Sequence, residues 1–220
     1  VIDFINHIDK NGYFEPISMS TDDIKRSQFY KDNEVRAIHQ IDFKSYDDFL
    51  ISLEMSSFIS SFSSLYMKRV TQLVNKTNQF NLTTKRYTSS EIESISEDDN
   101  YIKLYGILSD KFGDNGLVSV VIGRIEGRQC HIDLWVMSCR VLKRNFEHAM
   151  LDELVLQCKR MGVSEIMGYY YKSKKNSMVY TLYEEFGFSL FNQNGDNSLW
   201  KIDVSGYINK NKFIEVNNAV

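Results

Sequence analysis

Proline and cysteine are scarce in this sequence of 220 residues, which has one proline, Pro16, and three cysteines, Cys130, Cys139 and Cys158. The cysteines form neither a disulfide framework nor a metal-ligand spacing, so the sequence predicts no metal site and a reducing, cytoplasmic compartment. Because prolines are so few, clusters of Gly, Asn and Asp are expected to mark the breaks between elements.

Long apolar runs and a strong net charge are also missing. No apolar stretch approaches the roughly 20 residues that cross a bilayer, and residues 1–4 lack the basic start of a signal peptide. The formal net charge of -3 gives no broad attraction for nucleic acid or an anionic membrane. We therefore expect neither as a partner. The absence of an initiator Met suggests a fragment.

The composition is otherwise that of a globular protein with many aromatic residues. Hydrophobic residues make up 43% and charged residues 25%, with 14 Phe and 13 Tyr, which predicts an aromatic-rich core or cleft. The length suits one domain with an appendage, or two very small domains.

Residues 1–54 are predicted to be a helical lead-in. Residues 20–23 can cap a helix that runs to about Ala37, and residues 45–48 open a second, shorter one. Neither helix has a wide apolar stripe, so we expect the lead-in to pack against something else, such as a neighbouring domain.

Residues 55–205 are predicted to form the main domain, and residues 206–220 a C-terminal tail. The order is strand, two helices, three antiparallel strands, helix, strand, helix and two strands. This order predicts an α+β, mixed three-layer fold in which the long helix links two parallel strands. We expect strands near 58–62, 101–109, 117–125, 130–137, 165–171, 188–191 and 198–204, and helices from 63 or 64, from 89, at 146–161 and at 176–185.

The junction at residues 139–145 is a candidate phosphate site. It joins a strand directly to a strong helix, and so exposes backbone N–H groups at the positive end of the helix dipole, beside Lys143 and Arg144. An ordinary turn with two solvated basic residues is the commoner arrangement. Cys139 at this helix start can carry an acyl group as a thiolate, although a lone cysteine is more often an inert apolar residue.

Asp133 is a candidate general base. Strict alternation of strand 130–137 would place it on one face with His131, Trp135 and Met137. A carboxylate in such an apolar strand can have a raised pKa, although hydrogen bonding at a sheet edge is more usual.

Tyr183 is a candidate general acid. It lies one turn before Gly187, and a phenol there can supply a proton to a departing thiolate. Packing in the core is the simpler explanation.

The polar run at residues 75–87 is rich in amides and hydroxyls. Such a loop can bind a polar ligand through its side chains. It can equally well cap the preceding helix and lead into the next element.

Three segments carry a resemblance to a known family: 76–84 (KTNQFNLTT), 112–116 (FGDNG) and 138–142 (SCRVL). They resemble the FkbH-like proteins, which join a HAD-type phosphatase-like domain to a C-terminal GNAT-like domain. The resemblance covers nearly the whole chain and implies a GNAT fold after the helical lead-in. The Asp-x-Asp signature of the phosphatase-like half is not found after a strand in residues 1–54, so we expect that half to lie outside this chain.

The wider GNAT pattern implies a cofactor. Arg140-x-x-Lys143-x-Asn145 stands in the place of the R/Q-x-x-G-x-G/A pyrophosphate loop. Asn176 stands for the Asn that holds a pantetheine arm, and Tyr183 for the general acid. Both loop glycines are replaced, and a lysine side chain hinders close approach of a pyrophosphate. The expected cofactor is coenzyme A or, with its single phosphate, the phosphopantetheine arm of a carrier protein.

The resemblance implies an acyltransferase that leaves a glyceryl-type group as a thioester on an acyl carrier protein, for polyketide-type synthesis. The implied partners are this carrier and the phosphatase-like domain of the same polypeptide. The alternatives are an inactive module that docks the carrier, or one that braces the phosphatase-like domain. The residues so implicated are, for catalysis, Tyr183, Asp133 and Cys139; for the cofactor, Arg140, Val141, Leu142, Lys143, Arg144, Asn145 and Asn176; and for the acyl group, Asn78, Gln79, Asn81, Thr83, Arg86, Asp114 and Asn115.

Overall fold

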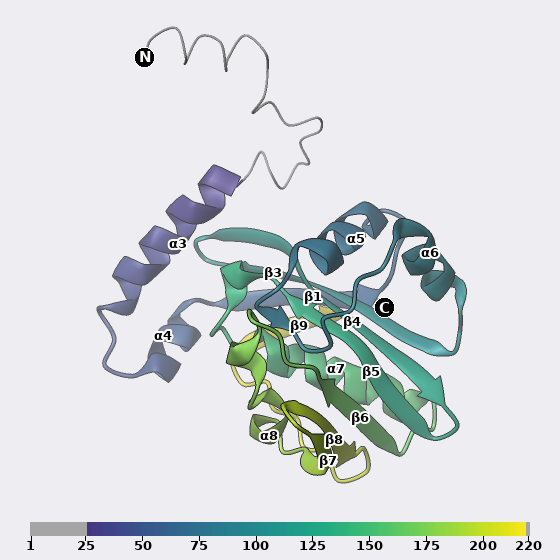
Figure 1. Cartoon of the computed structure of the whole chain (residues 1–220). Helices are drawn as coiled ribbons and strands as arrows, with labels where there is room; N and C mark the ends of the chain where they lie inside the picture. Colours follow the sequence, from purple (N-terminus) through teal and green to yellow (C-terminus); the bar gives the residue numbers. More distant parts are fainter. Residues whose placement is uncertain (1–25, 219–220) are drawn as a thin grey trace, which may run out of the picture.

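The computed structural model describes residues 26–218 (Figure 1); the predicted helix cap at 20–23 lies outside them. The helices are α3 (Arg26–Gln40), α4 (Tyr46–Ser52), α5 (Met67–Lys76), α6 (Ser89–Glu97), α7 (Phe146–Arg160) and α8 (Leu182–Glu185), with short 3-10 turns at Cys139–Val141 and Ser177–Val179. The strands are β1 (Met55–Ser61), β2 (Phe80–Asn81), β3 (Tyr101–Asp110), β4 (Gly113–Glu126), β5 (Gln129–Met137), β6 (Glu165–Tyr170), β7 (Ser189–Asn194), β8 (Asn197–Asp203) and β9 (Ile214–Asn218).

One mixed sheet organises the domain, in the order β7-β8-β6-β5-β4-β3-β1-β9, with β2 paired to β5. The predicted parallel pair across the long helix is confirmed, because β5 and β6 run parallel. Residues 206–220, expected to be a tail, include β9, which pairs in parallel with β1. This last strand therefore belongs to the sheet.

Helices cover both faces of the sheet and give the predicted three layers (Figure 1). On one face, Val70 and Leu73 of α5 and Ile92 of α6 pack with strand residues such as Val120 and Leu134. The other face packs against α7 and α8 in the larger core. The sheet is thus buried between two helical layers, which explains why its central strands are apolar along most of their length.

A β-bulge at Asp133 makes the predicted alternation of β5 wrong. Leu134 pairs with Ile122 and Ile132 with the next residue, Gly123, so that Asp133 has no partner in the ladder. An extra residue in one strand shifts the side chains that follow to the opposite face. Trp135 consequently joins Ile132 in the larger core, whereas strict alternation would separate them.

Local sequence signals explain several helix boundaries. Thr88 and Glu91 form a reciprocal capping box at the start of α6, and the side chain of Ser45 caps α4. The expected cap of α5 at residue 63 or 64 is wrong, since that helix begins after Tyr66 without a side-chain cap. The helix expected at 176–185 is divided into a 3-10 turn and α8. No helix within residues 26–218 has the length and apolar character needed to cross a bilayer.

The lead-in helix α3 is bound to the domain by a buried ion pair. Arg36 donates two hydrogen bonds of 2.8 Å to the carboxylate of Asp110 at the end of β3. Asn33 accepts from Arg144, which lies before α7, at 2.8 Å. The expectation that the lead-in packs against something is met within this chain, by the end of the sheet next to the candidate site.

Candidate functional site

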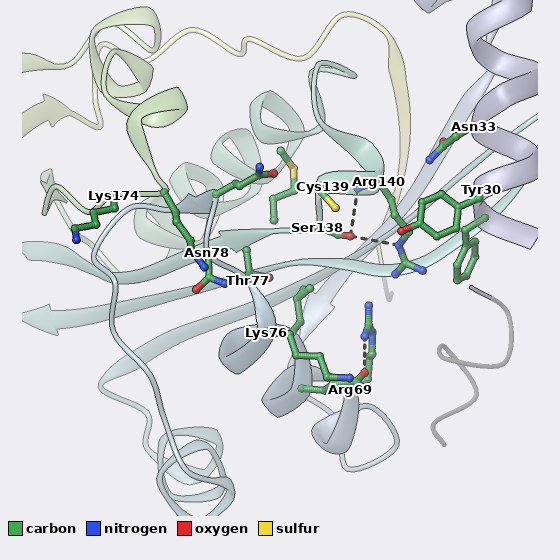
Figure 2. Close-up of a pocket in the computed structure, with 16 residues that line it drawn as sticks. Tyr30, Asn33, Arg69, Lys76, Thr77, Asn78, Ser138, Cys139, Arg140 and Lys174 are labelled. Atoms are coloured by element: carbon green, nitrogen blue, oxygen red, sulfur yellow. Dashed lines mark hydrogen bonds between the residues drawn. The ribbon is translucent and has the colours of Figure 1, made fainter. Parts of the chain in front are cut away.

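A pocket of about 910 Å³ lies beyond the C-terminal end of β5. Four segments build it: α3, α5 with the loop that follows it, the turn after β5, and the loop after β6 (Figure 2). The lining residues are Phe29, Tyr30, Asn33, Arg69, Gln72, Leu73, Lys76, Thr77, Asn78, Gln79, Met137, Ser138, Cys139, Arg140, Lys174 and Lys175.

The pocket is cationic. Five basic side chains line it, from Arg69, Lys76, Arg140, Lys174 and Lys175, and no Asp or Glu lines it in the part of the chain that the structure describes. The chain as a whole carries a formal charge of -3, so this lining is a local concentration of positive charge. Clefts lined by one sign of charge attract ligands of the opposite sign. The pocket therefore suits an anion.

Arg140 is held in the pocket wall by contacts on several sides. Its guanidinium lies over the ring of Phe29 from α3, at 4.0 Å from the ring centroid. Its Nε donates to Ser138 Oγ at 3.3 Å (Figure 2), and its carbonyl accepts from Arg144 at 2.9 Å. Helix α3 thus helps to position Arg140 in the pocket wall.

Arg144 supports the pocket from behind. Its guanidinium is buried and donates to Asp110 at 2.9 Å and to Asn115 at 3.3 Å. Burial, together with the neighbouring Arg36, lowers the pKa of Arg144 to about 10. The sequence assigned Arg144 to phosphate and Asn115 to substrate. In the structure they contact each other and lie outside the pocket lining.

The turn before α7 keeps a glycine-like backbone without glycine. Lys143 and Asn145, which stand where the pyrophosphate loop has its two glycines, have φ of 66° and 58°. Both values lie in the left-handed region, which costs a residue with a Cβ about 1–2 kcal/mol. Tyr46 of α4 donates a hydrogen bond of 2.5 Å to the carbonyl of Lys143 and so fixes the turn.

We expect Lys143→Gly to be more stable than Lys143→Ala by about 1 kcal/mol, because glycine relieves the left-handed strain and alanine does not. Urea unfolding of the two variants side by side measures this difference. Both lack the lysine side chain, so the comparison isolates the backbone. Equal stability of the two variants would show that the left-handed backbone at Lys143 is not strained.

Several predicted residues lie at the pocket and others do not. Cys139, Arg140, Asn78 and Gln79 line it, and Cys139 is an exposed free thiol. The remaining predicted residues lie elsewhere: Val141 is in the core, Leu142 packs against it, Lys143 is exposed, and Asp114 forms a turn by accepting from Gly116 N at 2.7 Å. Arg86 donates to the backbone carbonyls of residues 74 and 77, and so caps the end of α5.

Tyr183 is a core residue in this structure. It is fully buried, its hydroxyl donates to the carbonyl of Tyr169 at 3.5 Å, and its ring lies so close to Gly168 that a Cβ there would overlap it. Burial raises the pKa of the phenol well above its usual value. This placement agrees with the packing explanation; a role as general acid stays a prediction.

Asp133 lies between two cations. Its carboxylate accepts from Lys85 Nζ at 2.8 Å and from Arg124 Nε at 3.1 Å, and it does not line the pocket. The bulge that turns it away from the strict alternation brings it to these partners. An ion pair of this kind is a common structural arrangement, and the role of general base stays a prediction.

Asn176, Asn81 and Thr83 form a buried group next to the pocket. Asn176 Nδ2 donates to the carbonyls of Asn81 and Tyr171, both at 2.9 Å, and Thr83 Oγ1 donates to the carbonyl of Asp133 at 2.8 Å. These side chains are engaged with the backbone of the chain itself.

Sequence reasoning missed three walls of the pocket, and two of them had a signal in the sequence. Arg69, Gln72 and Lys76 recur at helical spacing on one face of α5, and the basic run at 172–175 follows a strand. Both patterns were available as signals. The third missed wall, formed by α3, has no comparable signal, because its place at the pocket depends on the ion pair with Asp110.

The phosphate and the extended chain of a thioester-bearing phosphopantetheine arm do not fit this protein equally well. An anionic phosphate suits the cationic lining of the pocket. An extended arm between β5 and β6 does not fit, because β2 pairs with β5 there at Met137 and Val136, and Asn176 already donates to the chain.

Comparisons with known proteins identify the fold. No family model matches the sequence, and no curated protein matches it. Among solved structures it is similar to the ribosomal-protein-S18-alanine N-acetyltransferase from Escherichia coli, with a TM-score of 0.52, 12% identity and coverage of 71% of this chain and 99% of the other. It is also similar to an acetyltransferase of the GNAT family from Streptococcus pneumoniae (0.52, 14%, 67% and 99%) and to the GNAT domain of S. lividans PAT (0.53, 8%, 66% and 89%). The chain therefore has the GNAT acetyltransferase fold that the sequence predicted.

Proposed function

We propose that this domain acts on an acyl thioester carried by the phosphopantetheine arm of an acyl carrier protein. The observation that carries the proposal is the cationic pocket next to the exposed Cys139, in a chain with an acetyltransferase fold. The resemblance to FkbH-like proteins supports a short polar acyl group of the glyceryl type, and a phosphatase-like domain of the same polypeptide as a further partner.

The residues of the pocket have distinct roles in this proposal. Arg140 and Lys76 bind the phosphate as positive charges, and Lys174 extends the positive lining. The side chains of Asn78 and Gln79 line the same pocket and offer amide groups to the hydroxyls of a glyceryl group. The arm, when bound, supplies the thioester carbonyl that reacts. Cys139 presents a thiol at the end of β5, beside this binding surface.

A second candidate function is a binding module without catalysis. Tyr183 and Asp133, which were assigned to catalysis, and Asn176, which was assigned to the pantetheine arm, are engaged with other parts of the chain. This engagement favours the binding module. Both candidates predict binding of the loaded carrier protein. A thioester exchange assay separates them, since a binding module would show carrier binding and no acyl exchange above the uncatalysed rate.

Arg140→Ala is expected to weaken binding of a phosphopantetheinylated carrier protein by about ten- to a hundredfold, as expected for the loss of a charged hydrogen-bond donor. Calorimetry on the full chain measures this. Arg160→Ala, at an exposed position in the last turn of α7, is the matched control and should bind normally. Lys143→Ala should also bind within about threefold of the unmodified chain, since Lys143 does not line the pocket. Normal binding by Arg140→Ala would contradict the proposal.

A further inference from the structure

The strands β5 and β6 pair over a short distance and then separate. Their register covers four positions, from Gln129 with Glu165 to Ile132 with Gly168. Beyond that point β6 continues to pair with β8 as far as Tyr170. We call the stretch beyond Ile132 and Gly168, where β5 and β6 no longer pair, the pairing gap. Unpaired strand edges of this kind accept an extended chain that carries amide groups.

Residues 80–83 fill the pairing gap from within the chain. On the β5 side, Leu82 N–H donates to the carbonyl of Trp135 at 3.3 Å, and Thr83 Oγ1 donates to that of Asp133 at 2.8 Å. On the β6 side, the carbonyl of Leu82 accepts from Tyr171 N–H at 2.8 Å. The segment therefore bridges both strands, as a strand inserted between them would.

The side chains of this segment make it part of the core. Leu82 is completely buried, and Asn81 and Thr83 are 1% and 2% exposed. Phe80 packs against Trp135 with 6.2 Å between the ring centroids. The side chain of Asn176 holds the segment by donating a hydrogen bond to the carbonyl of Asn81. Any ligand in the pairing gap would have to displace these contacts.

The start of α7 is an unfavourable binding site for a phosphate. Glu147 places a carboxylate in the first turn of the helix, where its Oε2 is buried without a hydrogen-bond partner within the described residues. A carboxyl group, which is negative when ionised, already occupies the positive end of the helix dipole. Once this carboxyl ionises, an incoming phosphate would meet a like charge there, whereas the pocket presents five basic side chains.

We infer that residues 80–83 are the specificity element of this site: they close the pairing gap to an extended thioester arm, so that the arm reaches the pocket from the side of α3 and α5. The inference rests on the proposed function. It also explains why the phosphate-binding cations come from α3-supported Arg140, from α5 and from the loop after β6, and not from the turn before α7. Free coenzyme A, whose pyrophosphate would lie at that turn, is disfavoured.

The test loosens the segment and measures the affinity of the full chain for coenzyme A by calorimetry. Leu82→Ala removes the buried anchor and is expected to tighten coenzyme A binding by about tenfold or more, because apparent affinity rises with the open fraction. Leu104→Ala, at a leucine in β3 that is 1% exposed, is the matched control and should leave the affinity unchanged. Equal affinity of Leu82→Ala and the unmodified chain, including no binding by either, would overturn the inference.

Thr83→Val provides a milder variant if Leu82→Ala does not fold. It keeps the shape of the side chain and removes one hydrogen bond to β5, so we expect binding to tighten by about fivefold. Ser119→Ala is its control, since Ser119 Oγ donates to the carbonyl of Val136 from the side of β4.

Hydrogen exchange on the unmodified chain tests the route directly, with free phosphopantetheine as the probe. Amide exchange of Leu82 and Tyr171 should be the same with and without the probe. Faster exchange at Tyr171 on binding would mean that the arm displaces the segment and would overturn the inference. The proposed function has a separate test: it would be contradicted if Arg140→Ala bound the carrier protein as tightly as the unmodified chain does.

Discussion

Asp110→Ala is expected to lower the free energy of unfolding by about 3–5 kcal/mol, the usual cost of removing one partner from a buried ion pair. The carboxylate of Asp110 is inaccessible and pairs with Arg36 at 2.8 Å and with Arg144 at 2.9 Å. Without it, two buried guanidinium groups lose their counter-charge. Urea denaturation with a tryptophan fluorescence readout measures the change. Carrier binding should also weaken, because α3 and Arg140 lose their common support.

Asp196→Ala is the control for this prediction. Asp196 forms an exposed ion pair with Lys172 at 2.9 Å, and such surface pairs contribute about 0–1 kcal/mol. A loss below about 1 kcal/mol in Asp110→Ala as well would show that α3 is not held to the domain by this carboxylate. The position of Arg140 would then need a support other than the ion pair between α3 and β3.

Glu147→Gln is expected to stabilise the protein by up to about 3 kcal/mol at pH 8 and to have little effect near pH 4, from the size of the pKa shift. Burial, with the nearby charge of Glu185, raises the pKa of Glu147 from 4.5 to about 7. Below pH 4.5 the carboxyl is protonated in both the folded and the unfolded state. Between pH 4.5 and 7 the unfolded chain ionises first, so stability falls as the pH rises. Above pH 7 the folded protein bears the full free-energy cost of holding this carboxylate ionised in a buried position.

Unfolding measured against pH in the variant and the unmodified chain gives the contribution of Glu147 as a difference. Glu91→Gln is the control of opposite sign. Its exposed carboxylate accepts hydrogen bonds from Thr88, which lower its pKa, so this substitution should destabilise the protein above the pKa of a free Glu. A difference curve for Glu147→Gln that is flat from pH 4 to 8 would show that burial does not raise the pKa of this carboxyl.

Most of the fold could be predicted from the sequence. The apolar repeat of α7, the capping box of α6 and the hairpin strands β3, β4 and β5 are local patterns. Each is set by residues within a few positions of one another, so no knowledge of distant contacts is needed. The bulge at Asp133 shows the limit of this approach. One extra residue in β5 has no signature in the strand's own sequence, and yet it reassigns Trp135 to the other face.

The candidate site was predicted in part. Cys139 and Arg140 at the end of β5, and Asn78 and Gln79 in the polar loop, do meet at one pocket. They were selected by residue type and by their place next to helix ends, which the order of elements fixes. Tyr183, chosen on the same grounds, lies in the core, because the side on which a short helix packs depends on what faces it.

The sequence by itself determined the order of the main helices and strands and the three layers. The tertiary structure alone decided which polar residues serve the pocket and which serve the fold. Asn176 contacts residue 81, which is 95 positions away, and Asp110 joins Arg36 to Arg144. A polar side chain is satisfied by whichever partner folding brings within about 3 Å, and no local pattern records that distance.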